Sequence, residues 1–145
     1  MRRTLTAVVT CTVLTAGAAA KADDQPDLVT ILTAPEAETQ LMAMVLTKQA
    51  MDQGAKAHIL LCGPGGDVAL QDAPASATAP QEPRGMSPQG LMKVIMAEGG
   101  TVEVCAIYLP NKGTGPEVLI DQVGVAKPPA MAARLLTDDT RILSF

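Results

Sequence analysis

Aromatic side chains are almost absent from this sequence, which has one tyrosine, one phenylalanine and no tryptophan among 145 residues. Proteins that bind single-stranded nucleic acid stack bases on several aromatic rings, so the composition argues against that class. Basic residues are also few, with 11 Lys and Arg against 15 Asp and Glu, and the formal charge is −4. An acidic surface repels phosphate groups, so we expect neither nucleic acid nor an anionic membrane surface as a partner.

The first 22 residues have the pattern of a secretory signal peptide. Two arginines follow the initiating methionine, residues 5–20 carry no charge, and Ala20-Lys21-Ala22 has the small-x-small form of a cleavage site. Cleavage near Ala22 would remove Cys11 and three basic residues, which leaves a formal charge of −7. No later segment is long and apolar enough to span a bilayer. We therefore expect a periplasmic or secreted protein.

The remaining residues, 23–145, are enough for one domain with a single core. Strand and helix patterns alternate along them, and the strands are nearly continuous apolar runs, as in a parallel sheet covered on both faces. Residues 72–86 are rich in Ala, Pro, Ser and Gln and predict a mobile surface loop. The sequence predicts strands at 27–33, 57–62, 100–109, 124–126 and 141–145, and helices at 35–53, 88–98, 116–123 and 130–136.

Two cysteines, Cys62 and Cys105, remain after export. Cys62 ends its predicted strand and Cys105 comes late in the next, and chemistry in such sheets collects at the carboxyl ends of strands. Neighbouring strands lie ~4.8 Å apart, within the ~4.4–6.8 Å between Cα atoms that a disulfide tolerates. The pair is therefore a candidate disulfide, dithiol redox pair or soft-metal clip. The alternative is that the register separates the two thiols and both are core filler.

Two other kinds of chemistry have weaker support. Copper(I) prefers sulfur ligands, and the mature chain has two cysteines and seven methionines, but most of the methionines have the spacing of helix core residues. His58 opens the strand that Cys62 ends, roughly 13 Å away at ~3.3 Å per residue. We therefore expect it to be a surface or rim residue and a poor base for Cys62. No cofactor is expected.

The order of these segments resembles the DsrE/DsrF-like superfamily, which includes sulfur-relay subunits. The resemblance rests on the opening strand and long helix at 27–54, the turn LLCGPGGDVAL at 60–70, the run GGTVEVC at 99–105 and the closing segment DTRILSF at 139–145. It covers nearly the whole mature chain. The chain departs from the best understood members in its export signal, in Cys62 and in the insert at 72–86.

The resemblance implies a three-layer α/β/α sandwich with a mostly parallel five-stranded sheet, in a family that commonly forms homo-oligomers. Cys105 falls on the position of the family's sulfur-accepting cysteine, which implies a persulfide or thiol acceptor, and Cys62 becomes its candidate resolving or disulfide partner. The implied partner is a sulfur-carrier or thiol protein. The rival hypothesis is a non-enzymatic binding or assembly subunit that binds copper or no metal, so whether the protein is an enzyme stays open.

Overall fold

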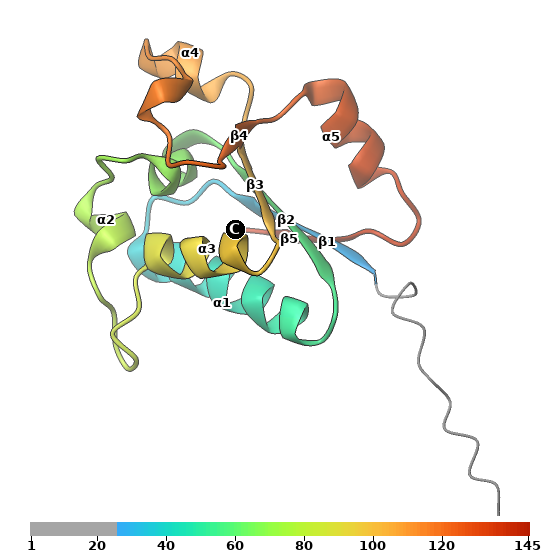
Figure 1. Ribbon diagram of the computed structural model, residues 1–145, viewed down its shortest axis with the longest axis horizontal. Helices are drawn as coiled ribbons and strands as arrows, with labels where there is room; N and C mark the ends of the chain where they lie inside the picture. Colours follow the sequence, from blue (N-terminus) through green and yellow to red (C-terminus); the bar gives the residue numbers. More distant parts are fainter. Residues whose placement is uncertain (1–25) are drawn as a thin grey trace, which may run out of the picture.

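The computed structural model describes residues 26–145, so the predicted signal peptide at 1–22 lies outside the described residues. Figure 1 shows a central sheet with helices on both sides. The strands are β1 (Asp27–Leu32), β2 (Lys56–Leu61), β3 (Thr101–Val104), β4 (Gly124–Val125) and β5 (Arg141–Ser144). The α-helices are α1 (Ala37–Asp52), α2 (Ala75–Thr78), α3 (Pro88–Ala97), α4 (Tyr108–Lys112) and α5 (Pro128–Leu135), and η1 (Gly63–Ala69) and η2 (Pro116–Val118) are 3₁₀ turns.

The five strands form one sheet in the order β4-β3-β2-β1-β5. Each neighbouring pair is parallel, with Asp27 opposite Lys56 and His58 opposite Thr101 in the central three strands. A parallel sheet places the carboxyl ends of its strands at one edge, so the segments that follow β2 and β3 lie side by side there.

Side chains alternate along the strands between two hydrophobic clusters, one on each face of the sheet. Leu32, Ile59 and Val102 join the larger cluster, which α1 and α3 cover. A hydrogen bond of 2.6 Å between the buried hydroxyls of Thr30 and Thr47 ties β1 to α1 on this face. The short α5 covers the opposite face (Figure 1). That face carries a smaller cluster, to which α5 contributes Met131. The result is the expected three-layer α/β/α sandwich.

Local signals in the sequence explain where the long helices begin and end. Ser87 caps α3, and its Oγ accepts a hydrogen bond of 3.1 Å from the backbone N–H of Gly90. The helix α1 ends just before Gly54, whose φ of 98° suits a residue without a Cβ.

Two predicted elements are wrong in extent. The strand expected at 100–109 ends at Val104, because the apolar residues that follow turn into α4, where Tyr108 and Leu109 are buried and Ile107 is exposed. Short apolar runs fit either a strand or a helix by periodicity alone. The helix expected at 116–123 is only the turn η2, because Leu119 is extended and pairs with Leu70, and Asp121 and Gln122 then form a turn.

The Ala- and Pro-rich segment 72–86 contains α2 and an antiparallel bridge between Gln81 and Met86. Ala77 is fully buried in the larger cluster, so part of this segment belongs to the core. Its mobility stays a prediction. Within residues 26–145 no helix has the length and apolar character needed to cross a membrane.

Candidate functional site

Cys62 and Cys105 lie at the carboxyl edge of the sheet, one residue beyond the ends of β2 and β3. Because Leu61 is opposite Val104, the register brings the two cysteines opposite each other. Their Cα atoms are 5.1 Å apart and their sulfurs form a disulfide. Of the alternatives left open by the sequence, the structure therefore shows the bridged pair, and the register does not separate the thiols.

Backbone hydrogen bonds hold both cysteines in line with the sheet. The N–H of Cys62 donates to the carbonyl of Leu32 at 2.9 Å, and the N–H of Cys105 donates to the carbonyl of Leu61 at 2.8 Å. Each bond extends the parallel ladder by one residue past the strand end. The position of the disulfide is thus set by the ends of neighbouring strands rather than by a free loop.

The disulfide lies on the face of the sheet that α5 covers. Both cysteines are half-buried and pack against the smaller cluster, and Cys105 also contacts the larger one. The residues that follow them in the chain are exposed to solvent: Ile107 is 69% exposed, and a Cβ built at Gly63 would meet nothing within 4 Å. The sulfurs are therefore neither sealed in the core nor freely exposed.

A polar contact joins the two segments that carry the cysteines. Asp67, in η1, accepts hydrogen bonds from the hydroxyl of Tyr108 at 2.6 Å and from Nζ of Lys112 at 2.7 Å, both in α4. Burial, and next the Asp67 carboxylate, raise the pKa of Tyr108 above its usual value, so the phenol stays protonated and donates. We call Asp67, Tyr108 and Lys112 the clamp.

Gly66 allows the clamp to close. A Cβ on this residue would overlap the ring of Tyr108, whose Cζ would lie 2.7 Å away. Neither the clamp nor this contact was predicted from the sequence. One signal was available, because the only tyrosine of the chain follows Cys105 by three residues, but nothing in the sequence pairs it with Asp67.

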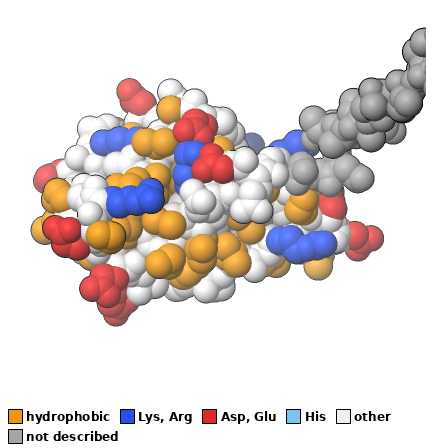
Figure 2. Space-filling model, turned by 90° about the horizontal axis from the view of Figure 1, so that it is seen from below, with side chains coloured by type: hydrophobic (Ala, Val, Ile, Leu, Met, Phe, Trp, Pro, Cys, Tyr) orange, Lys and Arg blue, Asp and Glu red, His pale blue; other side chains and the backbone are white. Residues whose placement is uncertain are grey.

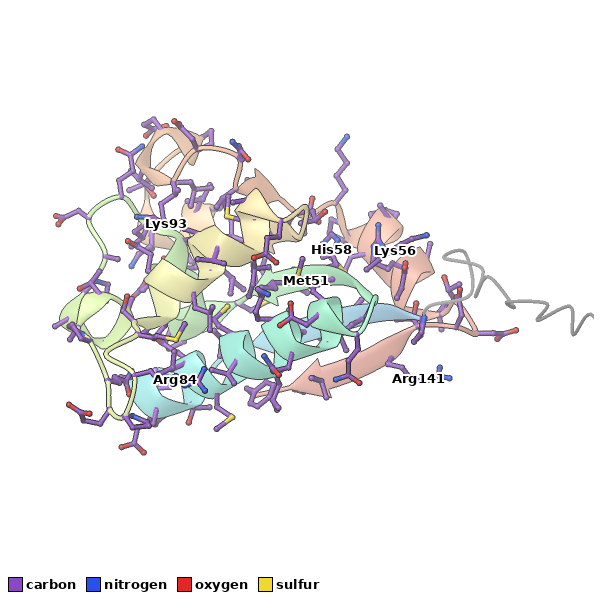
Figure 3. The ribbon with its side chains drawn as sticks, turned by 60° about the horizontal axis from the view of Figure 1, so that its bottom comes forward. Met51, Lys56, His58, Arg84, Lys93 and Arg141 are labelled. Atoms are coloured by element: carbon purple, nitrogen blue, oxygen red, sulfur yellow. A yellow bond between two sulfur atoms is a disulfide. The ribbon has the colours of Figure 1, made fainter. Side chains whose placement is uncertain are left out.

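His58 is buried, which corrects the expectation of a surface or rim residue. It is 6% exposed, and α5 lies over this face, where Arg134 and Asp27 form an ion pair of 3.1 Å. Its Nε2 is 2.8 Å from a carboxylate oxygen of Glu103. The angle between these groups is not that of a hydrogen bond, so the contact is an ion pair when His58 is protonated. Figure 3 shows His58 near Lys56, the first residue of β2. Cys62 follows the last residue of the same strand, so His58 and Cys62 belong to opposite ends of β2.

The pKa of His58 is lowered from its ordinary value of 6.5, first by burial and then by the positive charge of Arg134, against the opposing effect of Glu103. Below about pH 6.5 the unfolded chain therefore takes up a proton that the folded chain resists. We expect the free energy of unfolding to fall as the pH drops from about 7.5 to about 5.5. Urea denaturation at several pH values checks this, and His58→Gln should flatten the slope. An equal slope in the variant would show that other groups cause it.

Metal-binding geometry is not found in the described part of the chain. Among residues 26–145, no three His, Cys, Asp or Glu side chains gather closely enough to hold a metal ion. Met44 and Met92 are fully buried in the larger cluster and Met131 packs in the smaller one, so these three methionines have packing roles.

A groove lies away from the cysteines, on the outer face of α1 and α3. It has a volume of about 800 Å³ and extends to the loop at 81–86. Large apolar side chains are exposed on these two helices, with Met42 at 50%, Leu46 at 42% and Val94 at 42%. Figure 2, seen from below Figure 1, shows hydrophobic side chains on the lower surface with charged ones among them.

Two solved structures share this arrangement of strands and helices. The ychN protein from E. coli aligns with a TM-score of 0.60 and 20% sequence identity, over 83% of this chain and 99% of its own. MTH1491 from Methanobacterium thermoautotrophicum, a protein of unknown function, aligns with a TM-score of 0.66 and 14% identity, over 83% of this chain and 100% of its own. The fold is DsrE-like. No protein-family model and no curated protein matches the sequence.

Proposed function

We propose that this chain is an exported member of the DsrE/DsrF-like superfamily that handles sulfur or disulfides through its two cysteines. In this proposal Cys105 is the acceptor and Cys62 is the resolving partner. The observation that carries it is the disulfide itself: two residues 43 positions apart meet at the edge of the sheet where α/β proteins place their chemistry.

The surroundings of the pair suit reversible thiol chemistry. A thiolate must reach its target, and both cysteines keep partial exposure on a surface with the open position of Gly63 beside them. An exported protein meets an oxidising compartment, so the disulfide is the resting state and a thiol protein or sulfur carrier is the partner that would reduce or load it.

Oxidised glutathione tests the assignment of the acceptor. We expect the reduced Cys62→Ser protein to form a mixed disulfide at Cys105, and the reduced Cys105→Ser protein to react ~10-fold more slowly at Cys62. Intact mass spectrometry of quenched samples measures both rates. If each variant reacts only after unfolding, the cysteines are core residues and the proposal is wrong; if Cys62 reacts faster, the two roles are reversed.

A second candidate function is a non-enzymatic assembly subunit, and the exposed apolar face of α1 and α3 favours it. Burying Met42, Leu46 and Val94 against a second copy would remove their apolar surface from water, and the charged residues around the groove, Lys48, Asp52 and Arg84 among them, have both signs. We propose a homo-oligomer on this basis. Sedimentation of the wild type and of Leu46→Glu tests it, because the variant should dissociate, whereas a monomeric wild type would contradict it.

A further inference from the structure

We propose that the substrate of the cysteine pair is a persulfide, and that the pair reduces its outer sulfur to sulfide instead of storing it or passing it on. This inference rests on the proposed function, because it takes Cys105 as the acceptor. It goes further in naming the substrate class and the product. The observation behind it is that the sulfur of Cys62 reaches the sulfur of Cys105 in the folded protein.

The first step loads Cys105. Its thiolate attacks the outer sulfur of a persulfide R–S–SH, a new S–S bond forms at Cys105, and the R–S bond to that sulfur breaks to release the thiol R–SH. Cys105 now carries two sulfurs, its own inner one and the transferred outer one. No electrons leave the pair of reactants in this step, since one sulfur–sulfur bond replaces another.

The second step follows from the position of Cys62. Its thiolate attacks the inner sulfur of Cys105, which is the atom it contacts in the structure. The Cys62–Cys105 bond forms, the bond to the outer sulfur breaks, and that sulfur leaves as hydrosulfide, which takes up a proton. In sum, R–S–SH and two thiols give R–SH, hydrogen sulfide and one disulfide. The two cysteines are oxidised and the transferred sulfur is reduced.

Storage of a persulfide on Cys105 would require the reduced cysteines to move apart, and the structure opposes this. The N–H groups of Cys62 and Cys105 are bonded to the carbonyls of Leu32 and Leu61, so both backbones are part of the sheet. These bonds join backbone atoms of neighbouring strands and involve neither sulfur. The attacking thiol therefore stays beside Cys105 after reduction, at the high effective concentration that makes such a displacement fast.

The clamp holds the segments that leave the sheet. Asp67 bonds to both Tyr108 and Lys112, and Gly66 packs directly beneath the Tyr108 ring. The clamp therefore links the segment that follows Cys62 to the segment that follows Cys105. Both cysteines keep partial exposure, which leaves room for the outer sulfur to depart.

Each turnover ends with the disulfide that the structure shows, so a reductant must restore the thiols. A protein dithiol is the class that can do so: its first thiolate opens the Cys62–Cys105 bond, and its second displaces the resulting mixed disulfide and leaves as part of the oxidised partner. Two electrons enter per sulfide formed. Without this partner the reaction stops after one equivalent.

The test mixes the reduced full-length mature protein with glutathione persulfide, and measures released sulfide and the intact mass. The wild type should release about one sulfide per chain and end as the disulfide, as the two-step exchange requires. Cys62→Ser should hold one extra sulfur on Cys105 and release sulfide only slowly, by exchange with the one equivalent of glutathione that the loading step frees. Cys105→Ser should do neither. A wild type treated with oxidised glutathione, which forms the disulfide without sulfide, is the matched control.

The possible outcomes distinguish a failure of this inference from a failure of the proposed acceptor role of Cys105. If the wild type keeps the extra sulfur as stably as Cys62→Ser, the pair relays or stores sulfur and the inference is wrong, while Cys105 remains the acceptor. If neither the wild type nor Cys62→Ser takes up sulfur, the acceptor role itself fails. The wild-type result alone decides between reduction and storage, so the inference stays testable if a serine variant does not fold.

Discussion

Reduction of the Cys62–Cys105 disulfide is expected to lower the free energy of unfolding by about 4 kcal/mol. The bond links residues 43 positions apart, so it removes the conformations of a long loop from the unfolded chain. In the folded state the sheet and the clamp already hold both segments, so little order is lost on reduction. Most of the effect therefore comes from the gain in entropy of the unfolded chain.

Urea denaturation with and without a reductant measures this loss in the wild type. The double variant Cys62→Ser/Cys105→Ser is the matched control, because its unfolding should be the same in both conditions. A wild-type difference below about 1 kcal/mol would contradict the prediction, since loop closure of this length should contribute several times more. Such a result would mean that the unfolded chain keeps these segments together without the bond.

Gly65→Ala is expected to cost ~3 kcal/mol, because the new methyl group has no space. Gly65 is buried in η1, and a Cβ built there would lie 2.7 Å from the carbonyl carbon of Leu32 and closer still to its oxygen. A backbone carbonyl at the end of β1, which accepts a hydrogen bond from β2's continuation, cannot rotate away as a side chain can. The same Leu32 oxygen accepts the hydrogen bond from Cys62, so its displacement also disturbs the disulfide.

Gly63→Ala is the matched control for this prediction. Gly63 has a positive φ of 51°, which costs an alanine ~1–2 kcal/mol, but nothing lies within 4 Å of the new methyl. We expect Gly65→Ala to be the more harmful substitution, although only Gly63 has the unusual backbone angle. Urea midpoints of the two variants compare them. Equal or reversed losses would show that backbone conformation, and not the contact with Leu32, decides which glycine is needed.

Periodicity and helix-end signals were sufficient to predict most of the fold. The apolar run before Pro35, the cap at Ser87 and the glycines after α1 and α3 are local signals, because each acts within a few residues of the chain. The parallel sheet follows from strands that alternate with helices. The end of β3 could not be predicted, because the apolar residues 106–109 suit a strand or a helix, and their contacts in the folded protein decide.

The sequence by itself determined that Cys62 ends one predicted strand and Cys105 comes late in the next, and that the chain has few aromatic and basic residues. It also carried the resemblance to the DsrE-like fold. Only the tertiary structure decided that Cys62 and Cys105 meet, that Asp67 joins Tyr108, and that His58 is buried. The physical reason is register: a slip of one residue between strands turns a side chain to the other face, and register is set by packing across the whole sheet.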